Sequence, residues 1–149
     1  MPVKVNSWAA AGAALRLAKT FGDAAPVLRQ FYDYHAREID SVFETLAQGG
    51  EYRDLHWDGW SPYSYGRRRP SGRIVTPDSA LLQDTGRARQ DATTGVFVLQ
   101  KDRVLYGPSI FYAEDIYEKR SPYSVTNADR AKLRDLFRKA AGQAVRGRS

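Results

Sequence analysis

The sequence feature that most constrains the fold is one apolar stripe between residues 28 and 46. Its members recur at spacings of three and four residues, which is the period of one face of an α-helix. They are Leu28, Phe31, His35, Ile39, Val42, Phe43 and Leu46. Asp23 is a suitable N-cap, Pro26 suits the first turn, and Gly49-Gly50 should end the helix near Ala47. The stripe therefore predicts an amphipathic helix roughly 30 Å long, at about 1.5 Å per residue, which needs a second layer to cover it.

Two further helices are predicted towards the ends of the chain. Thr126 is a suitable N-cap for a C-terminal helix, and Asp129 would place a favourable negative charge in its first turn. The apolar stripe of that helix consists of Leu133, Leu136, Phe137, Ala140 and Ala141. Near the N-terminus, Ser7 should cap a short Ala-rich helix that runs to about Lys19 and carries Trp8. A helix this short is marginal alone, so we expect it to dock on its own domain or on a neighbouring subunit.

Short β-prone runs in the second half of the chain predict an antiparallel sheet. Val96–Leu99 and Arg103–Tyr106 flank a polar tip, a pattern typical of a hairpin. Residues 86–94, whose charged side chains alternate, are expected to add a further strand, and residues 110–118 a short helix. The sequence thus favours an α+β fold: the long amphipathic helix and the C-terminal helix pack on a small antiparallel sheet of three to four strands.

A chain of 149 residues is expected to form a single domain that buries about 68–70% of its unfolded surface. Within it we expect an N-terminal arm and short helix at 1–22, a core at 23–141 and a basic tail at 142–149. The chain has no cysteine, which excludes disulfides and thiolate metal sites. No apolar run approaches the roughly 20 residues that cross a bilayer, and the start of the chain does not resemble a signal peptide. We therefore expect a soluble protein that is made in the cytoplasm.

The segment from residue 51 to residue 77 combines frequent Gly, Pro and Ser with many aromatic residues. The turn residues disfavour a long helix, whereas the aromatic content is too high for a disordered linker. Loops of this kind either pack over a core or form an interface, in which Trp, Tyr and Arg are the usual anchors. The predicted interface residues are Trp8, Tyr52, Trp57, Trp60, Pro62, Tyr63, Tyr65 and Tyr112.

The formal net charge of +6 and the pI near 9.7 favour an acidic partner. Arg67, Arg68, Arg69 and Arg73 form the main cluster, beside the tyrosines at 63 and 65, and a second basic run lies in the last twelve residues. Basic residues interleaved with aromatic ones are typical of nucleic-acid surfaces, but protein interfaces have the same composition. A nucleic-acid-binding module therefore remains an alternative reading, with these arginines close to DNA.

Neither histidine belongs to a convincing chemical site. His35 with Glu38 or Asp40 could be drawn as a metal site, but the paired spacing of zinc sites is missing, and a histidine that fills a helix face is far more common. His56 and Asp58 could be drawn as an acid–base pair, but no nucleophile or orienting partner accompanies them. We therefore expect no catalytic residue, no metal and no cofactor.

Three groups of residues in a fixed order carry a resemblance to a known family. They are Trp60-Ser61-Pro62 after the long helix, the turn Leu82-Gln83-Asp84-Thr85-Gly86, and Tyr112-Ala113 after the hairpin. In this order and spacing the chain resembles the bacteriophage virion-morphogenesis family, which includes tail-completion and head–tail joining proteins. The similarity covers roughly residues 28–140.

The resemblance carries over at individual positions. The matched residues are Trp60 and Pro62, then Leu82, Thr85 and Gly86, then Tyr112 and Ala113, and finally Arg120 and Pro122 before the last helix. This chain departs from the pattern after the tyrosine–alanine pair, where relatives usually have a glycine and a longer loop but residues 114–120 run straight on.

The resemblance implies a structural virion protein rather than an enzyme. Such a protein would be assembled in the host cytoplasm and would act in the virion, as a symmetric ring taken as a hexamer. The ring would lie at the head–tail junction or at the head-proximal end of the tail. Its partners would be connector or adaptor proteins and tail tube or tail terminator proteins, with DNA passing close by. A ring needs a head-to-tail interface built from different patches of one small domain.

Overall fold

The computed structural model describes residues 3–4 and 22–146, with side chains for residues 22–143. The predicted helix at 7–19, with its candidate interface residue Trp8, lies outside the described residues. The described elements are β1 (Val3–Lys4), α2 (Ala25–Thr45), β2 (Gly50–Tyr52), β3 (Leu55–Trp57), the 3₁₀ turn η1 (Pro62–Ser64), α3 (Arg87–Thr94), β4 (Val96–Leu99), β5 (Val104–Gly107), α4 (Ala113–Tyr117) and α5 (Asn127–Arg146).

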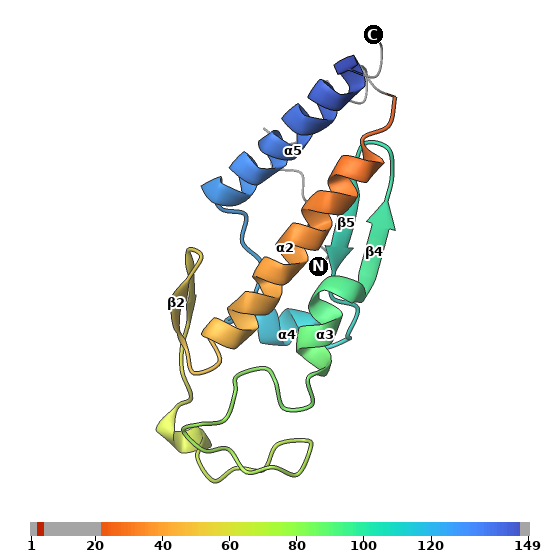
Figure 1. Cartoon of the computed structure of the whole chain (residues 1–149). Helices are drawn as coiled ribbons and strands as arrows, with labels where there is room; N and C mark the ends of the chain where they lie inside the picture. Colours follow the sequence, from red (N-terminus) through yellow and green to blue (C-terminus); the bar gives the residue numbers. More distant parts are fainter. Residues whose placement is uncertain (1–2, 5–21, 147–149) are drawn as a thin grey trace.

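Helix α2 runs through the middle of the structure, between α5 on one side and the strands β4 and β5 on the other (Figure 1). Its bounds confirm the predicted helix to within two residues at each end, and its buried face is the predicted stripe. The carboxylate of Asp23 accepts a hydrogen bond from the N–H of Ala25 at 2.9 Å. Phe31, Val42 and Phe43 are fully buried, and each such side chain contributes about 1.5–3 kcal/mol by leaving water.

The sheet is antiparallel in the order β1-β5-β4, so the α+β class with a three-stranded sheet is confirmed. Tyr106 on β5 pairs with Val3 on one side and Phe97 on the other. The predicted hairpin is present as β4 and β5, closed by a hydrogen bond from Gln100 N to Arg103 O at 2.8 Å. Helix α5 contacts α2, and α2 in turn contacts β4 and β5.

The predicted strand at residues 86–94 is wrong, because this segment forms α3. Gly86 has a φ of 77°, which suits glycine and leads the chain into the helix. Ala88 and Ala92, four residues apart, are the buried positions, which is the helical period rather than the strand period. The charged residues that suggested a strand face instead bond to neighbouring segments; Arg89, for example, pairs with Asp40 through two contacts of 2.6 and 2.8 Å.

A second, two-stranded hairpin, β2–β3, lies inside the segment that the sequence analysis treated as irregular. Its two-residue turn places Arg53 and Asp54 at φ values of 54° and 63°, a geometry for which Asn-Gly or Asp-Gly is the usual sequence signal. Gly49 is required before it: its φ is 88°, and a Cβ there would lie 2.7 Å from the backbone nitrogen of Gly59. The hairpin directs Trp57 into the core, where it is 1% exposed.

Helix α5 begins where predicted but ends later. Asp129 N donates to Thr126 Oγ1 at 3.2 Å, and Thr126 N donates to Asp129 Oδ2 at 2.9 Å, which is a reciprocal capping arrangement. The helix continues to Arg146, so residues 142–146 of the predicted tail are helical. Gly142 costs a helix only about 1 kcal/mol relative to alanine, which is too little to end it here.

Candidate functional site

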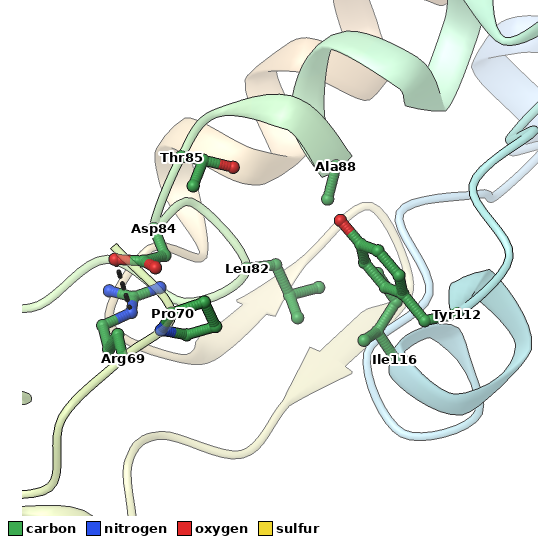
Figure 2. A pocket seen from close by; sticks show the side chains of 8 residues that line it. All are labelled: Arg69, Pro70, Leu82, Asp84, Thr85, Ala88, Tyr112 and Ile116. Atoms are coloured by element: carbon green, nitrogen blue, oxygen red, sulfur yellow. Dashed lines mark ion pairs between the residues drawn. The ribbon is translucent and has the colours of Figure 1, made fainter. Parts of the chain in front are cut away.

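A groove of about 390 Å³ opens between the loops at one end of α2 and the helices α3 and α4. It is lined by Arg69, Pro70, Leu82, Asp84, Thr85, Ala88, Tyr112 and Ile116. Figure 2 shows Pro70 and Leu82 on one side of the groove, with Tyr112 and Ile116 across from them. A mostly apolar lining with a few polar groups at one end is typical of sites that bury an apolar group from outside.

One wall of the groove is the turn at residues 79–86, which is pinned to the end of α2. Leu81 N donates to Ala47 O at 2.8 Å, and the Leu81 side chain is buried. The side-chain amide of Gln83 donates to Phe43 O at 2.7 Å. Between these anchors Leu82 has a φ of 58°, a left-handed conformation that costs a leucine about 1–2 kcal/mol. The two anchors therefore hold Leu82 in a strained conformation at the groove.

The opposite wall is α4, which packs on α3. Ala113 forms a small buried cluster with Ala88 and Ile110, separate from the main core. The Asp91 carboxylate fixes the approach to α4 by accepting hydrogen bonds from the N–H and hydroxyl of Ser109, both at 2.7 Å, and from Ile110 N at 3.0 Å. Burial alone would raise the pKa of Asp91, but these hydrogen bonds lower it below its ordinary value. Asp91 is therefore held as a carboxylate that sets the position of α4.

The polar end of the groove is the ion pair between Arg69 and Asp84, whose Nε–Oδ1 distance is 3.2 Å (Figure 2). Asp84 also accepts hydrogen bonds from the backbone N–H of Ser71, at 2.9 Å, and from the Ser71 hydroxyl. The Ser71 hydrogen bonds, with the nearby charges of Arg69 and Arg73, lower the pKa of Asp84. The guanidinium of Arg69 lies 5.3 Å from the ring centre of Trp60, within the range of a cation–π contact.

Two of the three residue groups on which the expected family resemblance was based meet at this groove. Leu82 and Thr85 line it from one side and Tyr112 from the other. Gly86 caps α3 directly after Thr85, and Ala113 anchors α4 beneath Tyr112. Because these two groups lie 26 residues or more apart in the chain, their meeting at one site is a product of the fold.

The predicted interface aromatics divide into buried and exposed sets. Trp57 is a core residue, so its prediction as an interface residue is wrong: it packs edge-on against Phe43, and its indole N–H donates to Ser121 O at 2.8 Å. Trp60 is half-buried, and its indole donates to Ser79 O at 2.6 Å. Tyr52 and Tyr112 are also half-buried. The exposed set consists of Pro62, Tyr63 and Tyr65, together with Phe111, which the sequence analysis did not select.

The predicted basic patch also divides. Arg67, Arg68 and Arg73 are exposed. The Arg69 side chain is only 11% exposed and is bound to Asp84, so its assignment to the DNA-facing surface is wrong. Arg69 fastens its loop to the turn that contains Asp84, and the other three arginines are exposed on the same loop.

A buried polar cluster centred on Asp129 was missed by the sequence analysis. The Asp129 side chain is fully buried and pairs with Arg53, which also pairs with Glu38 at 2.7 Å. Tyr34 donates its hydroxyl to Asp129 at 3.1 Å. The spacing of Thr126 and Asp129 signalled the helix cap, but nothing local to Arg53 signalled its burial. The cluster ties β2–β3, α2 and α5 together, which is a structural role.

The two histidines have different surroundings. His35 is fully buried; its Nε2 bonds to Ser124 O at 2.7 Å, and its Nδ1 lies in hydrogen-bond contact with the Tyr106 hydroxyl. His56 is exposed and lies 3.0 Å from Asp58 and 3.7 Å from Glu51. Among the residues that the structure describes, no three His, Asp or Glu side chains are grouped so that they could hold a metal ion.

Within residues 3–4 and 22–146, no helix is both long enough and apolar enough to cross a membrane. Comparisons with family models, curated proteins and solved structures found no match to this chain.

Proposed function

We propose that this protein is a structural subunit of a tailed bacteriophage particle. It would form a symmetric ring at the head–tail junction or at the head-proximal end of the tail, where it completes the tail or joins it to the head. The observation that carries this proposal is the meeting of Leu82, Thr85 and Gly86 with Tyr112 and Ala113 at one groove. These residues are part of the set, with Trp60, Pro62, Arg120 and Pro122, on which the expected resemblance to the virion-morphogenesis proteins was based.

The occupant that fits the groove is an exposed aromatic side chain of a neighbouring copy, and Tyr63 is the best candidate. It is 87% exposed and is held on η1 by hydrogen bonds from Tyr63 N to Ser61 Oγ at 3.3 Å and from Ser64 N to Ser61 O at 2.8 Å. A tyrosine in the groove would bury its ring against Leu82 and Ile116. Its hydroxyl would then meet the polar end at Asp84.

Such a contact is heterologous, because the knob and the groove belong to different parts of one subunit. η1 lies at the outer end of the loops, away from α3 and α4 (Figure 1). Repeated contacts of this kind close into a ring when the rotation between subunits divides a full turn. In this proposal the protein acts as a rigid wedge, copied around an axis, and it holds connector or adaptor proteins to tail tube or tail terminator proteins.

Cysteine crosslinking tests the contact directly, because the chain has no cysteine of its own. Tyr63→Cys and Ile116→Cys are introduced singly and together, and disulfides are formed by mild oxidation. Mixing the two single variants should give only a crosslinked species of twice the 16.8 kDa chain mass. The double variant should give a ladder that stops at the size of the ring.

The matched control pairs Tyr63→Cys with Val98→Cys, since Val98 is exposed on β4 and outside the groove. Crosslinking of the groove pair no faster than that of the control pair would count against the contact. Light scattering that finds only a monomer, both alone and with the neighbouring virion proteins, would count against the ring itself.

A further inference from the structure

Residues 66–75 form a small hairpin, called the arginine hairpin below. Val75 N donates to Arg67 O at 2.8 Å, and Arg69 N donates to Arg73 O at 2.8 Å, with Arg68 paired to Ile74 between them. The turn is closed by Gly72 N and Arg69 O at 2.8 Å. It has Pro at its second position and Gly at its fourth, as type I turns favour. The backbone of this arginine-rich stretch is therefore ordered by its own hydrogen bonds.

The arginine hairpin is fastened to the body at its turn and at its base. At the turn, Asp84 binds Ser71 and Arg69, and the Arg69 guanidinium lies over Trp60. At the base, Val75 is 5% exposed. Successive side chains of a hairpin point to opposite faces, so Arg68 and Ile74 share one face of the hairpin, while Arg67, Arg69, Arg73 and Val75 share the other. On that second face Arg69 and Val75 are held against the rest of the protein, whereas Arg67 and Arg73 stay exposed.

The remaining three arginines have few partners within the described part of the chain. Arg67, Arg68 and Arg73 are all exposed, and none of them forms an ion pair with a described carboxylate. Arg68 donates a long hydrogen bond of 3.4 Å to Gly72 O in its own turn. Arg73 contributes to the field at Asp84 without pairing with it. Three guanidinium groups are thus held on one short, fastened element with their donors available.

We infer that the arginine hairpin binds the phosphodiester backbone of nucleic acid. Arg67, Arg68 and Arg73 contact phosphates, and Arg69, Ser71 and Asp84 are positioning residues that fix the hairpin. Guanidinium forks match phosphate oxygens in pairs, and the net charge of +6 attracts a polyanion over distance. An acidic protein is the competing partner, and the polyglutamate measurement below tests it. This inference does not rest on the ring, which depends on the groove and on Tyr63.

The first test measures how binding depends on salt. A fluorescent duplex of about 20 base pairs and a single strand of the same length are titrated with the full chain from about 50 to 200 mM salt. Replacing Arg67, Arg68 and Arg73 together by Gln should weaken binding about tenfold or more and reduce the salt slope by roughly 3. The matched control replaces the exposed Lys101, Lys119 and Arg134 by Gln, which removes the same charge elsewhere. Equal losses in the two triple variants would overturn the inference.

The second test asks whether Asp84 affects binding by holding the arginine hairpin in place or only through its negative charge. Asp84→Ala removes one negative charge, so a purely electrostatic attraction predicts tighter binding. If Asp84 holds the hairpin in its binding geometry, the same change should instead weaken binding by about threefold, since the freed side chains must be ordered again. Tighter binding by this variant, with an unchanged circular dichroism spectrum, would overturn the positioning role. Binding of polyglutamate as tight as that of either nucleic acid would overturn the choice of partner.

Discussion

The pairs Arg53–Asp129 and Arg69–Asp84 have the same chemistry in two different regions of the molecule. The first joins β2–β3 to the start of α5, with side chains 9% and 0% exposed. The pair has further partners: Arg53 also donates to Glu38, and Asp129 also accepts from the Tyr34 hydroxyl and from Thr126 N. The second joins the arginine hairpin to the turn at 79–86, with side chains 11% and 13% exposed.

The two pairs differ in whether the charged groups around them stay exposed to solvent. Around Asp129 the polar groups satisfy one another, so the pair serves the stability of the body and presents nothing to solvent. Around Asp84 the pair fixes a loop whose other arginines stay exposed, beside a groove that is open to solvent. An Arg–Asp pair thus stabilises the core in the first region, whereas in the second region it positions a loop with exposed arginines. Four predictions test that contrast, from the largest expected effect to the smallest.

Removing the Asp129 carboxylate should have the largest effect. Asp129→Ala leaves Arg53 buried with only Glu38 as a partner and removes one of the two hydrogen bonds that cap α5. Breaking a buried pair in this way costs about 3–5 kcal/mol, so the free energy of unfolding should fall by that amount. Urea unfolding followed by tryptophan fluorescence measures it, because Trp57 is in the core.

Asp135→Ala is the control on the same helix. Asp135 is exposed and pairs with Lys139 at 3.3 Å, so its loss should change stability by less than about 0.5 kcal/mol. Equal effects from the two substitutions would show that the Asp129 cluster does not stabilise the body.

Acid should act on the two regions at different pH values. His35 is neutral in the folded chain: Nε2–H donates to Ser124 O, and Nδ1 accepts from the Tyr106 hydroxyl. Burial lowers the pKa of His35 below its ordinary 6.5, although Asp129 and Glu38 oppose the shift. The unfolded chain therefore takes up this proton first, and stability should fall as pH drops below about 6.5, by at most about 1.4 kcal/mol per pH unit.

The pKa of Asp84 is also lowered, but from 3.8, by its hydrogen bonds with Ser71. Its contribution is present above pH 3.8 and is lost only as the pH falls below that value. Urea midpoints measured between pH 7 and pH 5 should therefore report His35 and not Asp84. The slope in this range should disappear in His35→Gln and persist in His56→Gln, since His56 is exposed. A slope that persists in His35→Gln would assign it to another group.

The parts of the fold that the sequence predicted are those set by local pattern. The stripe of α2, the cap of α5 and the β4–β5 hairpin each have a period or a signal within a few residues. The predictions were wrong where contacts between residues far apart in the sequence determine the local structure. Residues 86–94 have the charge alternation of a strand, yet the turn at Gly86 and the packing of Ala88 and Ala92 make them a helix. The hairpin β2–β3 was missed because its two-residue turn is Arg53-Asp54, which lacks the usual glycine.

The candidate site shows the same division. Leu82, Thr85 and Tyr112 were selected from the sequence as parts of separate motifs, whereas Pro70, Ala88 and Ile116 were not, and the groove that unites them could not be predicted without the fold. Composition alone placed Trp57 among the interface aromatics and Arg69 among the free arginines. Composition does not say which side chains the fold buries: Trp57 packs in the core, and Arg69 is bound to Asp84.

Removing the Arg69 side chain should loosen the arginine hairpin and leave the body almost unchanged. Arg69→Ala loses the ion pair with Asp84 and the contact with Trp60, both on the loop side of the protein, so the urea midpoint should move far less than in Asp129→Ala. Hydrogen exchange should nevertheless speed up at the amides of Val75 and Arg69, which close the hairpin. Exchange in α2 should not change. Faster exchange throughout α2 would mean that the hairpin is part of the cooperative core, and the contrast between the two regions would fail.

The smallest effect is expected at Arg68, whose side chain faces outward. Arg68→Ala removes an exposed charge and a 3.4 Å hydrogen bond to its own turn, so the free energy of unfolding should change by less than about 0.5 kcal/mol. The measurement is the same urea titration, and Arg53→Ala is the control. Arg53→Ala should destabilise the protein as much as Asp129→Ala does, because it leaves the buried Asp129 carboxylate without its partner. A loss above about 1 kcal/mol from Arg68→Ala would place this arginine among the residues that hold the fold. The hairpin would then be stabilised by its own arginines rather than by Asp84, and Arg68 would not be free to meet a phosphate.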